Sequence, residues 1–196
     1  MKVISQKDKK QAFDILTNGG ILGVPTETVY GIASSLESRD GIEKLIKIKK
    51  RPITSDKCFT LMLPSVKDIP RFADISRQEA NLSRRYFPGE LTMIFNKNPD
   101  FKNYYFDNFN TIGIRIPAHK YMLELLEKTG PLLVTSANPR GETPCLDWSE
   151  FKTRMPKADA VIRGKSGNSL PSTILDIRSS IPHIIRQGGL LIVQYN

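Results

Sequence analysis

The sequence has few of the residues from which metal centres and disulfide frameworks are built. Its 196 residues include two cysteines, Cys58 and Cys145, and two histidines, His119 and His183. The cysteines lie far apart and form no CxxC pair, so neither a zinc site nor a disulfide framework is expected. Two scattered histidines are too few for a metal cluster. This cysteine usage is typical of a reducing compartment.

The sequence also lacks a long apolar run. None approaches the ~20 residues that a membrane-spanning helix needs. The first residues, MKVISQKDKKQAFDIL, contain no apolar core and no cleavage site of a signal peptide. We therefore expect a cytoplasmic protein with no membrane partner.

The common nucleotide and nucleophile motifs are missing as well. A GKS triplet occurs at residues 164–166, but Asp159 stands where a P-loop needs its first glycine. No GxGxxG follows a strand candidate, and no GxSxG occurs. Covalent catalysis is therefore not indicated.

Composition and charge are those of a globular protein with an excess of positive charge. Hydrophobic residues make up 39% and charged residues 25%, so one domain over residues 1–196 can build a core. Lys and Arg total 29 against 20 Asp and Glu, a formal charge of +9. This excess favours nucleic acid, nucleotide or phosphate as a partner, and a solvated basic surface is the alternative.

Hydrophobic periodicity alternates between helix and strand along the chain. Helical spacing occurs over residues 7–18, 40–50 and 119–130, and SRQE at 76–79 is a capping box that opens a helix ending before Pro88. DWSE at 147–150 is a second capping box. Strands are expected at 20–25, 58–63, 90–95, 111–116, 131–137, 159–162, 172–177, 183–187 and 190–193. The strands are not regularly separated by helices, which predicts a mixed α/β fold rather than a doubly wound parallel sheet.

Short polar side chains gather where several apolar runs end. VPTETVYG (24–31) follows one run, TSAN (135–138) follows another, and PST (171–173) opens a third. Such segments are either ordinary loops or the rim of a site. Arg115 lies inside the apolar TIGIRIP run, so it needs either a salt bridge or a bound anion.

Three further segments have two interpretations each. Lys49, Lys50 and Arg51 at a predicted helix end either favour the helix dipole or clamp a phosphate. NPDFKNYYFDNFN (98–110) either packs onto the domain, which we favour, or stacks on bases. RGKSGNS (163–169) is either a loop that closes over a nucleotide or a plain surface turn.

Seven segments occur in an order that resembles the YrdC family. They are PTETVYG, KxRP (49–52), PGxxT (88–92), IRIPxH (114–119), TSANxxG (135–141), PST (171–173) and IIRQG (184–188). Each is weak alone, but together they cover residues 10–190 in the family's order. The resemblance implies a single-domain twisted α/β sandwich with a large mixed sheet and a concave basic face. It also implies the short form, without the extra C-terminal domain of the longer members.

Catalytic members of this family are threonylcarbamoyl-AMP synthases, which are nucleotidyltransferases. The resemblance implies that L-threonine and bicarbonate form a carbamate, which attacks the α-phosphorus of ATP and releases pyrophosphate. A partner among the tRNA-modification proteins then transfers the threonylcarbamoyl group to tRNA. Mg²⁺ would accompany ATP, held by phosphate oxygens and water rather than by a protein site.

The resemblance also assigns residues to this chemistry. The KxR…SxN set is complete and implies catalysis and ATP binding by Lys49, Arg51, Ser136 and Asn138, with Arg186 as a further phosphate contact. The implied threonine site consists of Thr26, Arg115 and Ser172, with Arg115 on the carboxylate. Glu27 is expected to orient a neighbouring basic group.

Two segments are closer to the YciO branch of the same fold. These are ITSDKCFTLM (53–62) and TIGIRIP. YciO-type proteins often lack the full KxR…SxN set. The alternative function is therefore a protein that binds double-stranded RNA or tRNA without synthase activity.

Overall fold

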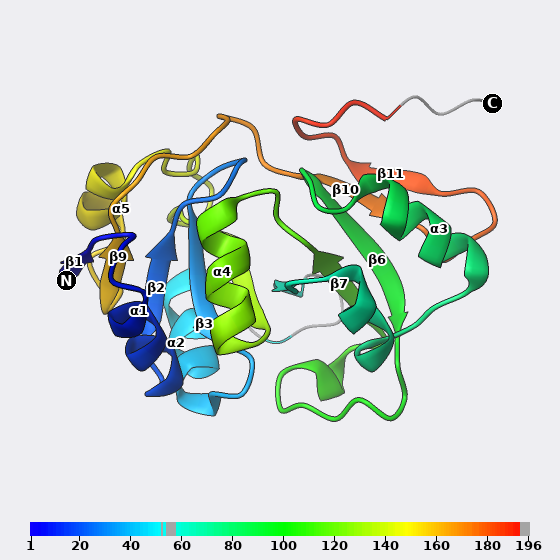
Figure 1. Ribbon diagram of the computed structural model, residues 1–196, viewed down its shortest axis with the longest axis horizontal. Helices are drawn as coiled ribbons and strands as arrows, with labels where there is room; N and C mark the ends of the chain where they lie inside the picture. Colours follow the sequence, from blue (N-terminus) through cyan, green and yellow to red (C-terminus); the bar gives the residue numbers. More distant parts are fainter. Residues whose placement is uncertain (52, 54–57, 193–196) are drawn as a thin grey trace.

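The computed structural model describes residues 1–51, 53 and 58–192, and in this part of the chain one mixed sheet carries helices on both faces (Figure 1). The strands run in the order β1-β9-β2-β3-β8-β4-β7-β6-β10-β11, and β5 pairs with β6 beside this path. Their bounds are β1 (Lys2–Ile4), β2 (Ile21–Val24), β3 (Gly31–Ser35), β4 (Thr60–Met62), β5 (Ala73–Asp74), β6 (Leu91–Lys97), β7 (Thr111–Arg115), β8 (Leu132–Ser136), β9 (Ala160–Ile162), β10 (Thr173–Asp176) and β11 (His183–Arg186). Parallel pairs such as β6–β10 lie beside antiparallel pairs such as β6–β7. The expected mixed α/β fold with a large sheet is confirmed.

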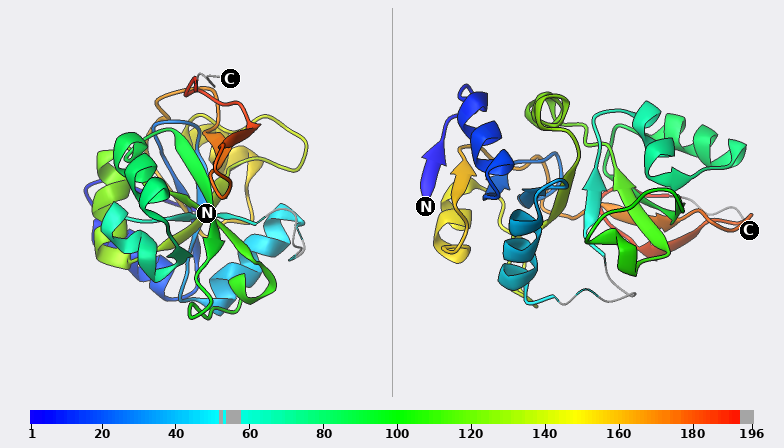
Figure 2. Two further views of the ribbon diagram at one scale, coloured as in Figure 1. Left: turned by 90° about the vertical axis from the view of Figure 1, so that its right-hand side faces the viewer. Right: turned by 90° about the horizontal axis from the view of Figure 1, so that it is seen from below.

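The helices cover the two faces because the strand side chains alternate between them. The bounds are α1 (Lys9–Thr17), α2 (Arg39–Lys49), α3 (Arg77–Tyr86), α4 (Lys120–Thr129) and α5 (Trp148–Arg154). Figure 2 shows α1, α3 and α4 on one face and α2 and α5 on the other. In β2, Leu22 and Val24 pack in the cluster of α1 and α4, whereas Ile21 packs with α2. Gly23 faces α5, where an added Cβ would lie 2.6 Å from the Phe151 ring.

Most helix ends follow from the sequence. Ser76 and Glu79 form the expected capping box at the start of α3, which ends before Phe87 and Pro88. Asp147 caps α5 by accepting from the backbone of Ser149 and Glu150. The predicted second capping box is wrong for Glu150. Its side chain accepts from Leu146 N at 3.0 Å rather than from Asp147 N.

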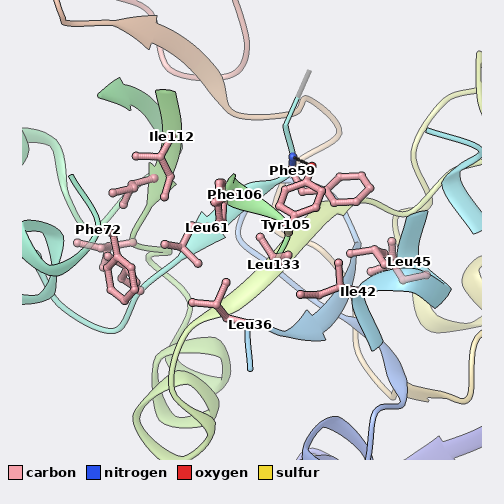
Figure 3. Packing of buried hydrophobic residues seen from close by; sticks show 14 of the residues in the cluster. Leu36, Ile42, Leu45, Phe59, Leu61, Phe72, Tyr105, Phe106, Ile112 and Leu133 are labelled. Atoms are coloured by element: carbon pink, nitrogen blue, oxygen red, sulfur yellow. Dashed lines mark hydrogen bonds between the residues drawn. The ribbon is translucent and has the colours of Figure 1, made fainter. Parts of the chain in front are cut away.

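The aromatic segment 98–110 packs onto the domain, as we favoured. Its short 3₁₀ helix η2 (Phe106–Asn108) and its neighbours bury Tyr105, Phe106 and Phe109. The Tyr105 ring stacks on Phe59 with centroids 5.3 Å apart, and the Tyr105 hydroxyl accepts from Phe59 N at 2.7 Å (Figure 3). This segment therefore supports the start of β4.

Four strands differ between prediction and structure. β1, β3 and β5 were not predicted, and the predicted strand 190–193 is wrong for its described residues 190–192, which are not part of the sheet. The chain leaves β11 through Gly188, and Leu190 O instead accepts from the side chains of Thr173 and Gln187. Val193 lies outside the described residues. Among the described helices, none combines the length and hydropathy of a membrane span.

Candidate functional site

A cavity of about 150 Å³ opens where the ends of β7 and β8 meet the start of β10 and the loop after β2. Six of the eight residues assigned from the sequence line it: Thr26, Arg51, Arg115, Ser136, Ser172 and Arg186. Lys49 and Asn138 do not. Three guanidinium groups face this space, and its described lining contains no aspartate or glutamate. The cavity is therefore concave and basic, and its charge suits an anionic ligand.

The loop after β2 forms one wall through a directed chain of hydrogen bonds. Thr26 Oγ1 donates to Val29 O at 2.7 Å and accepts from Thr28 N at 3.1 Å. Thr28 Oγ1 lies 2.9 Å from Thr26 Oγ1 and accepts from Arg115 Nη2 at 3.0 Å. Since the Thr26 proton points to Val29, Thr28 is the donor in the pair. Both hydroxyls are buried, so these bonds are shielded from water.

Tyr30 ends the same loop. The residue contributes to the cavity lining, and its side chain is fully buried. The hydroxyl donates to Ile162 O, and burial raises the Tyr30 pKa. Tyr30 therefore anchors the loop to β9.

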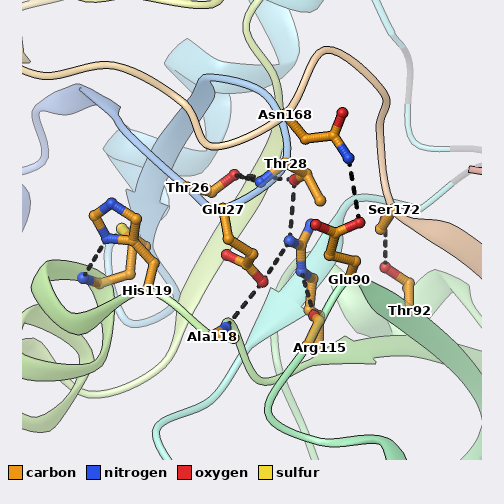
Figure 4. A network of polar contacts seen from close by, with 12 residues as sticks. Thr26, Glu27, Thr28, Glu90, Thr92, Arg115, Ala118, His119, Asn168 and Ser172 are labelled. Carbon is orange, nitrogen blue, oxygen red and sulfur yellow. Dashed lines mark hydrogen bonds and ion pairs between the residues drawn. The ribbon is translucent and has the colours of Figure 1, made fainter. Parts of the chain in front are cut away.

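Glu27 and Arg115 form a mostly buried ion pair beneath the cavity (Figure 4). Arg115 Nη2 donates to Glu27 Oε1 at 2.7 Å, and the side chains are 5% and 14% exposed respectively. Glu27 Oε1 also accepts from Ala118 N at 2.9 Å, and Arg115 Nε donates to Gly89 O at 3.2 Å. Glu27 thus orients a basic group, as the sequence analysis anticipated. The salt-bridge alternative for Arg115 is confirmed, and the residue also lines the cavity.

The guanidinium of Arg115 keeps part of its binding capacity. Its Nε and one terminal nitrogen are occupied by Gly89, Glu27 and Thr28. Nη1 has no acceptor among the described residues. An anion in the cavity can therefore bind Arg115 without breaking the pair with Glu27.

Lys49 holds the loop after β8 instead of lining the cavity. Its Nζ donates to Ser136 O at 2.8 Å, to Asn138 O at 2.6 Å and to Asn138 Oδ1 at 3.1 Å. Ser136 Oγ donates to the same Oδ1 at 2.6 Å. Three of the four KxR…SxN residues thus form one hydrogen-bonded unit. Burial, together with the charge of Arg51, lowers the pKa of Lys49 to about 8.

Arg51 lies on the cavity side of the same helix end. Its guanidinium stands over the Phe59 ring, 5.4 Å from the centroid, and has no hydrogen-bond or ion-pair partner among the described residues. The ring orients the charge without neutralising it. Pro52 and residues 54–57, part of the YciO-like segment, lie outside the described residues.

Ser172 and Arg186 form the opposite wall. Arg186 Nη2 donates to Ser172 O at 2.6 Å and reaches Ser172 Oγ at 3.3 Å. Ser172 Oγ also lies 3.0 Å from Thr92 Oγ1. Partial burial, together with the charge of Arg115, lowers the pKa of Arg186. The antiparallel pairing of β11 with β10 brings Arg186 to this wall of the cavity.

The sequence analysis missed the parts of the site that act through backbone or aromatic contacts. Phe59 lies below Arg51, Gly89 contributes a carbonyl to Arg115, and Thr92 pairs with Ser172. Gly89 and Thr92 belong to the PGxxT motif, which is the signal that could have identified them. The Phe59 contact leaves no mark in the sequence.

The chain is similar to known proteins over most of its length. The family model Sua5_yciO_yrdC, described as "Telomere recombination", matches residues 14–188. A threonylcarbamoyl-AMP synthase of Enterobacter sp. (strain 638) is 29% identical over 85% of this chain and 89% of the relative. One of Vibrio campbellii is 28% identical over 93% of this chain and 100% of the relative.

Solved structures show the same fold. E. coli YciO is 25% identical with a TM-score of 0.86, over 96% of this chain and 95% of that chain. P. abyssi Sua5 complexed with L-threonine is 24% identical with a TM-score of 0.87, and this chain spans 58% of its length. Because the family model matches almost the whole chain, the protein belongs to the Sua5/YciO/YrdC family.

Proposed function

We propose that the protein is an ATP-dependent L-threonylcarbamoyladenylate synthase. The observation that carries the proposal is a basic cavity lined by Arg51 and Ser136, behind which Lys49 and Asn138, the other two members of the KxR…SxN set, are hydrogen-bonded to Ser136. The curated relatives named threonylcarbamoyl-AMP synthase support it, since they align over nearly their full length.

The reaction needs no protein nucleophile. The amino group of L-threonine and bicarbonate give a carbamate with loss of water. A carbamate oxygen then forms a bond to the α-phosphorus of ATP, and the bond to the β-phosphate oxygen breaks. Pyrophosphate leaves with the electron pair. Catalysis of such a step rests on positioning and on stabilising charge, which the three arginines can supply.

We assign the two substrates to opposite ends of the cavity. Arg115, with Nη1 open, would bind the threonine carboxylate beside Ser172 and the Thr26 wall. Arg51 and Arg186 would bind phosphate oxygens, and Ser136 would meet the nucleotide near its α-phosphate. Lys49 would act mainly by fixing Ser136 and Asn138 and by adding positive charge behind them.

Mg²⁺ would enter as part of the ATP complex. The described lining offers cations and hydroxyls but no carboxylate, so these residues do not form a protein cage for a divalent cation. Phosphate oxygens and water would hold the ion.

RNA binding is the second candidate, and the net charge of +9 together with the YciO likeness favours it. If positive charge drives this binding, the affinity for tRNA or double-stranded RNA should fall steeply as the salt concentration rises. We also propose that the product passes to other tRNA-modification proteins, which fits action in the cytoplasm.

Pyrophosphate release by the purified protein tests the synthase proposal. With ATP, Mg²⁺ and bicarbonate, release should require L-threonine and should be absent with glycine or L-valine. Arg51→Ala should lower the rate at least tenfold with an unchanged circular dichroism spectrum, and Lys47→Ala, an exposed lysine on α2, is the control. Release independent of L-threonine would refute the proposal. An RNA shift at low salt without any pyrophosphate would favour the second candidate.

A further inference from the structure

The loop 163–169 is bound on both of its edges by backbone hydrogen bonds. On one edge, Trp148 N donates to Gly164 O at 3.2 Å and Ser166 N donates to Leu146 O at 2.7 Å. On the other, Gly167 N donates to Thr26 O and Asn168 N donates to Thr28 O, both at 3.0 Å. The loop therefore joins the start of α5 to the cavity wall. With both edges bound, the loop is neither free to close over a nucleotide nor a plain surface turn.

Gly167 is the point of closest approach between this loop and the wall. A Cβ built on it would stand 2.7 Å from Glu27 O and 3.2 Å from the Glu27 C and Cα atoms. These are backbone atoms, which cannot move aside as a flexible side chain does. Only a glycine lets residues 167–168 make both hydrogen bonds at this spacing.

Residues 26–28 pass this constraint on to Arg115. Glu27 Oε1 and Thr28 Oγ1 both accept from Arg115 Nη2, at 2.7 and 3.0 Å. Asn168 continues on the far side, with Nδ2 3.5 Å from Glu90 Oε2, next to the Gly89 carbonyl that accepts from Arg115 Nε (Figure 4). The loop thus flanks both segments that orient the guanidinium.

We propose that Gly167 is a positioning residue for the amino-acid end of the cavity. Its close contact with the Glu27 backbone sets the position of Glu27 and Thr28, and these two residues fix the direction of the Arg115 guanidinium. This inference rests on the proposed function, in which Arg115 binds the substrate carboxylate. A residue at the surface loop, outside both hydrophobic clusters, would then control affinity for L-threonine but not for ATP.

The matched pair Gly167→Ala and Gly164→Ala tests this inference. The two glycines lie in the same loop, but a Cβ on Gly164 would meet mainly Gln6 Nε2, the end of an exposed flexible side chain, at 2.7 Å. Gly167→Ala should raise KM for L-threonine about tenfold, as a misplaced binding group does, with KM for ATP within about twofold. Gly164→Ala should leave both values within about twofold of wild type.

Asn168→Ala provides a second variant in case Gly167→Ala does not fold. Asn168 Oδ1 accepts from the backbone of Ser169 and Leu170, so its loss loosens the loop without adding volume. It should raise KM for L-threonine about threefold and spare ATP. Equal effects on both substrates, or no effect in a folded variant, would overturn the inference.

The failure of this inference is distinguishable from failure of the proposed function. If the wild type releases no threonine-dependent pyrophosphate, the proposed function fails, and crystal structures of wild type and Gly167→Ala (or Asn168→Ala) decide the positioning claim. Displacement of Glu27 Oε1 from Arg115 Nη2 in the variant would support it. An unchanged Glu27–Arg115 contact would overturn it.

Discussion

Lys49 gives a prediction whose size follows from the structure. Its ammonium is buried among the acceptors of residues 136 and 138, and burial lowers its pKa from 10.5 to about 8. Because the folded state holds this proton less tightly than the unfolded state, the free energy of unfolding rises with pH between about 8 and 10.5. At 1.36 kcal/mol per unit, the full shift is worth roughly 3 kcal/mol.

Lys49→Met isolates this contribution, since it keeps the apolar stem and removes the charge. We expect the unfolding free energy of wild type minus variant to increase by roughly 2–3 kcal/mol from pH 7 to pH 10. Urea denaturation at each pH measures the difference, and the subtraction cancels groups that titrate equally in both proteins. Lys47→Met, an exposed lysine on the same helix, controls for loss of a lysine. A constant or falling difference would refute the reasoning.

Three further predictions concern stability. Glu27→Ala leaves Arg115 without its buried carboxylate and should lower the unfolding free energy by about 3–5 kcal/mol in urea, whereas a loss below about 1 kcal/mol would contradict a buried pair. Tyr105→Phe keeps the ring stack but removes the acceptor of Phe59 N, so we expect a loss of about 1–3 kcal/mol, and no loss would show that water replaces the hydroxyl. Ser76→Ala removes the cap of α3 and should cost about 0.5–2 kcal/mol; an unchanged denaturation midpoint would disprove this.

Elements with strong periodicity or caps were predictable from the sequence. α4 and the start of α3 follow from apolar spacing and from the Ser76–Glu79 capping box. β3 was missed because GIASS contains small and polar residues, and it becomes a strand only between β2 and β8. The 190–193 run is apolar enough for a strand, but its described residues 190–192 lie outside the sheet, and Leu190 O accepts from the side chains of Thr173 and Gln187.

The sequence could predict which residues form the site, but not where their side chains point. Motif order identified six residues that line the cavity. It could not show that the Lys49 ammonium points to the carbonyls after β8, because a long side chain can lie along either side of a helix end. Nor could it show that Arg51 rests on Phe59, since that contact depends on the pairing of β4 with β7 and β8.

The order of the strands has a consequence for synthesis on the ribosome. Among the described strands, β1 pairs only with β9, joining Lys2 to Ala160, and the segment after β9 crosses the molecule to place β10 beside β6 (Figure 1). A nascent chain therefore carries an unpaired β1 until residues 160–162 have been made, and Arg186 reaches the cavity after the other residues that line it. Such distant parallel pairings form slowly. Until β9 is available, the exposed edge of β1 is open to aggregation with other chains.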